Sequence, residues 1–108
     1  MTDRAITPAS VHLRALLSQH LPELRKLLTK YKAYNPRLFG SVARGTATDH
    51  SDIDILVDMD EADGNLLLRS AGLLDETRAL FKTDVDIFPR QLLRTPIDST
   101  AVKDAISL

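Results

Sequence analysis

The spacing of apolar residues changes along the chain from helical to alternating, and it predicts the order of the elements. Thr7-Pro8 has the form of an N-cap followed by a first helical residue, so a helix is expected to begin there and to break or kink at Leu21-Pro22. Apolar residues then recur at helical spacing, as in an amphipathic helix: Leu24, Leu27, Leu28 and Tyr31. Asn35-Pro36 is expected to end this helix, because proline disfavours helical backbone in the preceding residue.

Three short apolar runs, at residues 37–39, 53–57 and 83–88, are predicted strands. A brief helical turn is expected over 41–44, and a helix over 66–81 with these leucines as core contacts: Leu66, Leu67, Leu73, Leu74 and Leu80. The tail, 91–108, is predicted to be helical in two pieces around Thr95-Pro96. The order of elements favours an α/β (α+β) fold, a small mixed sheet flanked by helices.

Composition narrows the class of protein. A chain of 108 residues is the size of one core, so residues 1–108 are expected to form a single domain. The net charge of -1 provides no overall attraction for nucleic acid or an anionic membrane, so any phosphate binding must be local. The absence of cysteine excludes disulfides, thiolate zinc sites and cysteine nucleophiles. With no signal sequence or membrane-length apolar segment, a cytoplasmic location is expected.

The strongest chemical signal is a pair of carboxylates at the start of the second predicted strand. Asp52 and Asp54 are two residues apart, so they project side by side while Ile53 enters the core. A third acid is needed to hold two divalent ions, and the last strand offers Asp84 and Asp86 on one face. Asp86 is preferred because apolar residues flank it. Two Mg²⁺ ions about 4 Å apart would clamp the attacking and leaving oxygens of a phosphoryl centre.

A glycine-rich turn precedes these carboxylates. Gly40 and Gly45 let the backbone curl and direct N–H groups at a phosphate, and Ser41 can donate to a phosphate oxygen. Arg44 is suited either to a phosphate or to bracing an aspartate. The P-loop and dinucleotide-binding patterns are both absent, and no histidine supports a serine-histidine-acid triad.

Other polar residues have simpler interpretations. The acids that follow the second strand are expected to be solvated where the chain leaves the sheet: Asp58, Asp60 and Glu61. His12 and His20 are predicted to lie on helix surfaces, and His50 to be an ordinary loop residue.

The sequence GSVARG, followed by SDIDILV and later by VDIF, resembles the minimal nucleotidyltransferases of the DNA polymerase β superfamily. Their signature is G-S, ten residues, D-x-D and a later aspartate, which corresponds here to Gly40, Ser41, Asp52, Asp54 and Asp86. The resemblance implies a polymerase β-like fold in which the three aspartates bind two Mg²⁺ and the Gly-Ser turn holds a nucleoside triphosphate. It also implies that a hydroxyl attacks the α-phosphate and releases pyrophosphate, with the third aspartate helping to activate that hydroxyl.

Nucleotidyltransferases of this size are often encoded beside a small helical HEPN ribonuclease toxin. The resemblance therefore implies an antitoxin that transfers AMP from ATP to a toxin tyrosine. Two alternatives stay open: an antitoxin that acts by binding alone with a non-essential acidic site, and an enzyme for a small-molecule alcohol that works with a partner subunit or as a homo-oligomer. DNA-templated polymerisation is disfavoured because the chain has no basic track. The acceptor, the number of nucleotides transferred and the choice of base are not determined by the residues.

Overall fold

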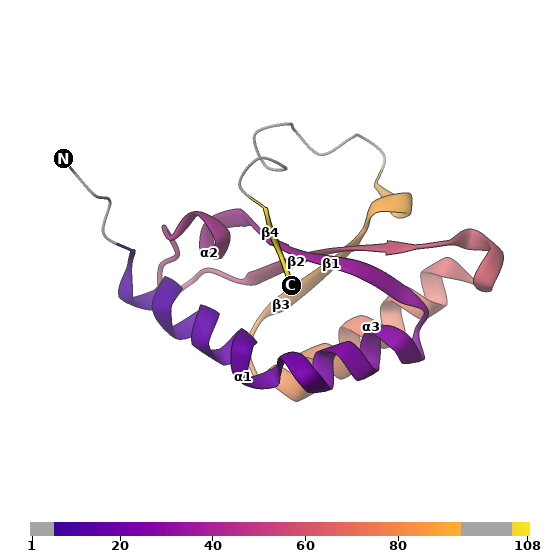
Figure 1. Ribbon diagram of the computed structural model, residues 1–108, viewed down its shortest axis with the longest axis horizontal. Helices are drawn as coiled ribbons and strands as arrows, with labels where there is room; N and C mark the ends of the chain where they lie inside the picture. Colours follow the sequence, from indigo (N-terminus) through magenta and orange to yellow (C-terminus); the bar gives the residue numbers. More distant parts are fainter. Residues whose placement is uncertain (1–5, 94–104) are drawn as a thin grey trace.

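A computed structural model describes residues 6–93 and 105–108 (Figure 1). Its elements in chain order are α1 (Pro8–Lys30), β1 (Ala33–Phe39), α2 (Gly40–Arg44), β2 (Ile53–Met59), η1 (Glu61–Asp63), α3 (Leu66–Phe81), β3 (Val85–Pro89), η2 (Arg90–Leu92) and β4 (Ile106–Ser107). The strands form one sheet in the order β3-β2-β1-β4. Within it, β1 runs antiparallel to β2 and β4, whereas β2 and β3 are parallel.

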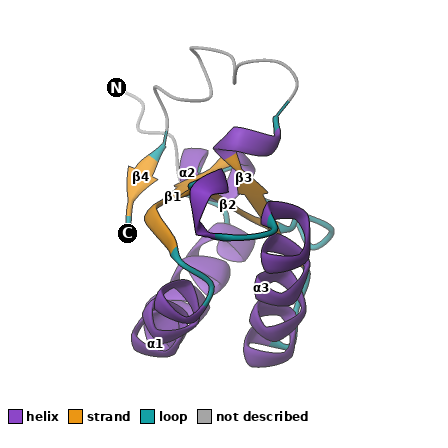
Figure 2. Cartoon of the chain, turned by 90° about the vertical axis from the view of Figure 1, so that its right-hand side faces the viewer, coloured by secondary structure: helices purple, strands orange, loops and turns teal. Residues whose placement is uncertain are grey.

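Two layers make up the fold. Figures 1 and 2 show α1 and α3 side by side against one face of the sheet, with the short α2 at the end of β1. The predicted class, a small mixed sheet flanked by helices, is therefore confirmed. None of the described helices is both long enough and apolar enough to cross a membrane.

The core lies between the two long helices and the sheet. Alternate residues of β2 are completely buried there: Ile53, Ile55, Val57 and Met59. Leu24 of α1 and Leu73 of α3 are also fully buried against them. The remaining residues of β2 point to the opposite face, as the predicted alternation requires, and Asp54 is among them.

Helix α1 is longer and more continuous than expected. Thr7 is its N-cap, accepting a 3.2 Å hydrogen bond from the Ser10 N–H, as predicted. The expected break at Leu21-Pro22 is wrong, because the helix continues through Pro22 to Lys30. Proline removes one backbone hydrogen bond, but buried leucines on both sides of it, Leu17 and Leu24, anchor both halves to the core. Val11, an apolar residue near the start of this helix, is 55% exposed.

Asn35-Pro36 does not end this helix but lies inside β1. The helix ends at Lys30, and Lys32, at φ +57°, turns the chain toward the sheet. Asn35, at φ +55°, and Pro36 sit where the pairing of β1 with β2 shifts register. A bulge accommodates a residue that cannot donate to the ladder, so this proline interrupts a strand rather than a helix.

Helix α3 has the bounds that its pattern predicts, and Asn65 caps it by accepting from the Leu68 N–H at 3.0 Å. Leu66 and Leu73 are buried as expected, but Leu67 is 67% exposed and makes no core contact. Gly72 lies inside this helix because a Cβ there would come 2.6 Å from the ring of Tyr31. The helix therefore packs closely on the end of α1 at this point.

The end of the chain differs most from expectation. Instead of a helix, Ile106 and Ser107 form β4, paired with Leu38 and Arg37 of β1. The unpaired edge of β1 provides hydrogen bonds that no local pattern in the tail reveals. The η2 turn covers the start of the predicted helical tail, and the part at 94–104 lies outside the described residues.

Candidate active site

Three carboxylates converge where β2 and β3 begin. The strands are parallel neighbours, and Asp54 of β2 lies directly opposite Asp86 of β3. Asp52 immediately precedes β2, whose start is held by the Ile53 N–H, which donates to the Asp84 carbonyl at 3.0 Å. One carboxylate oxygen from each of Asp52, Asp54 and Asp86 lies within 4.8 Å of the others. The Asp84 side chain is exposed and is not in this cluster, so the geometry favours Asp86 as the third acid.

Burial and neighbouring acids together raise pKa values in this cluster. Burial, followed by the charges of Asp86 and Asp52, raises the pKa of Asp54 to about 6, while Arg44 opposes the shift. Burial and the neighbouring Asp86 and Asp84 likewise raise the pKa of Asp52. Burial is therefore the leading cause of both shifts, and neighbouring carboxylates add to it. Three convergent hard oxygen donors, two of them without an ion pair among the described residues, fit a divalent ion such as Mg²⁺.

Gly40 brings the preceding turn into direct contact with this cluster. Its φ is +76°, and a Cβ at this position would lie 2.5 Å from Asp54 Oδ2. Only glycine lets β1 end and α2 begin so close to the carboxylate. Ser41 follows and is partly buried, while the side chain of Arg44 is exposed and forms no ion pair with a described residue. Bracing of an aspartate by Arg44 is therefore not observed.

The start of α1 holds the turn that follows Gly40. Arg14 donates to the carbonyls of Val42 and Ala43 at 3.0 and 2.8 Å. Thr7 donates through its hydroxyl to the Ala47 carbonyl at 2.6 Å, and Ser10 accepts from the Ala47 N–H at 2.8 Å. No local sequence pattern indicates these contacts, because they join residues about thirty to forty positions apart.

Arg78 is a further residue beside the cluster that local sequence patterns do not indicate. From the last turn of α3, its Nε donates to the Val85 carbonyl at 2.9 Å and its Nη2 to Asp86 Oδ1 at 2.8 Å. Its position on the helix that leads into β3 is the one hint in the sequence of a contact with that strand. Nothing else in the local pattern distinguishes it from other arginines on helix surfaces.

The expectation that Asp58 is solvated where the chain leaves the sheet is wrong. Its side chain is 8% exposed, and its Oδ1 accepts from Arg37 at 3.1 Å and from Arg90 at 2.9 Å. Asn35 donates to Oδ2 at 3.0 Å. Burial alone would raise the pKa of Asp58, but these hydrogen bonds and charges outweigh it and lower that pKa. Asp60 and Glu61 are exposed, as predicted.

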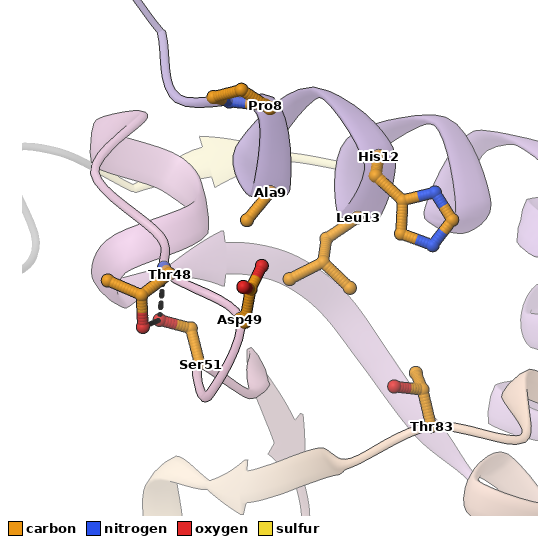
Figure 3. A pocket seen from close by; sticks show the side chains of 8 residues that line it. All are labelled: Pro8, Ala9, His12, Leu13, Thr48, Asp49, Ser51 and Thr83. Atoms are coloured by element: carbon orange, nitrogen blue, oxygen red, sulfur yellow. Dashed lines mark hydrogen bonds between the residues drawn. The ribbon is translucent and has the colours of Figure 1, made fainter.

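A cavity of about 350 Å³ lies behind the loop that leads to Asp52 (Figure 3). Its walls come from the start of α1, from this loop and from the approach to β3: Pro8, Ala9, His12, Leu13, Thr48, Asp49, Ser51 and Thr83. Figure 3 shows Asp49 pointing from the loop toward Ala9 and Leu13. His12 and His50 are exposed, as predicted, whereas His20 is partly buried against Phe81, with ring centroids 5.4 Å apart.

Comparisons with known proteins agree with the geometry. A family model described as "Nucleotidyltransferase domain" matches residues 17–108. A solved structure described as a "putative minimal nucleotidyltransferase" superposes with a TM-score of 0.71 at 33% identity, covering 92% of this chain and 95% of that one. The chain belongs to the minimal nucleotidyltransferase family.

A named relative gives the same assignment. The protein adenylyltransferase MntA of Thermococcus cleftensis is 31% identical over 94 residues, which are 87% of this chain and 90% of the relative. As a member of this family, the chain is a nucleotidyltransferase, and the family implies use of a nucleotide substrate and a metal.

Proposed function

We propose that this minimal nucleotidyltransferase transfers AMP from ATP to a hydroxyl of a partner protein. The observation that carries the proposal is the convergence of one oxygen each from Asp52, Asp54 and Asp86 within 4.8 Å. The contact between Gly40 and Asp54 adds a turn beside this cluster that can receive phosphates. The description of the Thermococcus relative as a protein adenylyltransferase supports a protein acceptor.

The three aspartates would hold two Mg²⁺ ions. The positive charge of these ions would offset the negative charge of the triphosphate and of the transition state. Gly40 and Ser41 would hold the triphosphate, and Arg44, whose exposed side chain has no ion pair among the described residues, would bind its phosphate tail. Asp86 would also accept the proton of the attacking hydroxyl. The hydroxyl oxygen bonds to the α-phosphorus while the bond to the β-phosphate breaks, and pyrophosphate carries away the charge.

The acceptor in this proposal is a tyrosine of a small helical HEPN-type toxin, which makes the protein an antitoxin. The family resemblance supports this choice of partner and of ATP. The partial exposure of Asp52, Asp54 and Asp86 is compatible with it, because a tyrosine presented by a separate protein can reach them.

The experiment that tests the proposal follows label from ATP labelled at the α-phosphate to the helical protein encoded beside this one. Asp52→Asn and Asp54→Asn should abolish labelling, because each removes a charged ligand with little change of shape. Asp84→Asn is the matched control, since Asp84 lies in the same segment as Asp86 but outside the cluster, and it should retain labelling. Full labelling by Asp52→Asn and Asp54→Asn would contradict the metal assignment. Neutralisation of the toxin by these variants without ATP would favour an antitoxin that acts by binding alone.

A further inference from the structure

We propose that Arg78 is a positioning residue that holds the Asp86 carboxylate in place for metal binding. This inference rests on the proposed function, because it concerns one carboxylate of the same cluster. Arg78 lies on α3, and it contacts β3 at two successive residues, the Val85 carbonyl and Asp86 Oδ1. The planar guanidinium therefore fixes the carboxylate relative to the backbone of its own strand.

The backbone contact gives this arginine a fixed location. Among the described residues, β3 is at the edge of the sheet and β2 is its only strand neighbour. The Val85 carbonyl accepts from Arg78 Nε at 2.9 Å, so the side chain binds the edge strand as well as its acid. Arg78 would stay beside β3 even when Asp86 binds a metal, because one of its two hydrogen bonds does not involve the carboxylate.

Asp86 is half-buried and lies beside two other acids, so a contact that holds its carboxylate matters. Its side chain is 36% exposed, and its negative charge lies close to those of Asp52 and Asp54, which repel it. Arg78 occupies Oδ1, whereas Oδ2 accepts no hydrogen bond from the described residues. Among the residues that the structure describes, Asp86 is also the one carboxylate of the cluster with an ion pair. Arg78 thus opposes the repulsion and leaves one oxygen of Asp86 to bind a cation.

The positive charge of Arg78 by itself weakens metal binding, because it repels a nearby metal cation. This effect opposes the gain from positioning Asp86. The Arg78 side chain is 49% exposed, so solvent and salt screen this repulsion. Loss of an outer contact to a metal ligand typically weakens metal binding about 10- to 100-fold. We therefore expect the positioning effect to exceed the charge effect, and removal of Arg78 to weaken metal binding.

The test measures Mn²⁺ binding by calorimetry in the absence of nucleotide. Arg78→Gln should weaken binding about tenfold, at the lower end of the range because the ion pair is partly exposed. Lys30→Gln is the matched control, because it breaks the Lys30–Glu76 pair between α1 and α3, whose side chains are 59% and 38% exposed. It should leave Mn²⁺ affinity unchanged. Circular dichroism and thermal midpoints would establish that each variant is folded.

A double-mutant cycle distinguishes positioning from general damage. Arg78→Gln should have no further effect on Mn²⁺ binding in an Asp86→Asn background, because its partner is already altered. Unchanged or tighter binding by Arg78→Gln, or the same loss in both backgrounds, would overturn the role of Arg78. Equal binding by the unmodified protein and Asp86→Asn would instead contradict the proposed metal site. The two ideas therefore fail in different experiments.

Discussion

Two carboxylates on one face of β2 have opposite surroundings. Asp54, near the start of the strand, has acids as neighbours, and its pKa is raised to about 6. Asp58, four residues on, is bonded by Asn35, Arg37 and Arg90, and its pKa is lowered. Burial acts on both, so the difference comes from their partners. The protein neutralises the charge of Asp58 with two arginines, whereas Asp54 has no ion pair among the described residues and lies beside two further acids, which suits a cation from solution.

The largest expected effect is the loss of activity in Asp54→Asn. If Asp54 binds metal, AMP transfer should fall by roughly a hundredfold or more, because charge stabilisation at the phosphoryl centre is lost. Thermal stability without metal should stay the same or rise, since the substitution relieves repulsion between acids. Labelling assays and thermal unfolding in a chelator would measure the two effects. A large loss of stability would show that Asp54 is structural, like Asp58.

Asp58→Asn should have the opposite pattern of effects: a loss of stability with little loss of activity. It leaves Arg37 and Arg90 without their buried anion, so the free energy of unfolding should fall by about 2 kcal/mol. This is less than the ~3–5 kcal/mol of a fully buried pair, because Arg90 is 61% exposed and can reach water. Urea unfolding would measure the change. AMP transfer per folded molecule should remain within a few-fold of the unmodified protein, and a hundredfold loss would remove the distinction between the two carboxylates.

Gly40→Ala tests whether close packing on Asp54 matters. The new methyl group would meet Asp54 Oδ2 in a backbone conformation that disfavours side chains, so we expect a loss of about 1–2 kcal/mol and weaker Mn²⁺ binding. Gly64→Ala is the matched control, because Gly64 also has positive φ but its nearest contact would be 3.7 Å away, at Arg69. That variant should lose stability without any change in metal binding. Equal metal affinity in both variants would exclude a specific contribution from the Gly40 contact.

The smallest effect is a difference in how stability depends on pH, measured in a chelator. The folded pKa of Asp54 is about 6, above its ordinary value of 3.8, so the folded state binds more protons between these values. Its contribution to stability should therefore decrease as pH rises from about 4 to 6. The lowered pKa of Asp58 has the opposite sign: its contribution is present above the ordinary value of 3.8 and is lost as pH falls through the folded pKa. Urea titrations of Asp54→Asn and Asp58→Asn should each lack the corresponding slope.

Local patterns predicted the parts of the fold that depend on neighbouring residues. Helix α3, the α2 turn and the alternation of β2 follow from spacing and capping within a few positions. The convergence of Asp52, Asp54 and Asp86 followed from alternation and the assumption that two strands are neighbours. The roles of these acids in metal binding and catalysis stay predictions.

Tertiary contacts decided the features that the sequence did not reveal. Pro22 is tolerated because the core holds both halves of α1, and β4 exists because β1 offers an unpaired edge. Asp58 was misjudged because its partners come from β1 and η2, far along the chain. Arg78 was missed for the same reason, since the contact with Asp86 depends on how α3 returns to the sheet. Each case requires knowledge of which distant segments become neighbours.

The parallel pairing of β2 with β3 also has a kinetic consequence. Asp54 and Asp86 meet only after α3 has crossed from one strand to the other, and such non-local pairing is slow because the intervening chain must be ordered first. Repulsion between these carboxylates opposes this step directly. We therefore expect refolding to be slower above pH 6 than below it in a chelator, and divalent cations to accelerate it. An acidic site placed between two strands thus becomes a barrier that the chain must cross in order to fold.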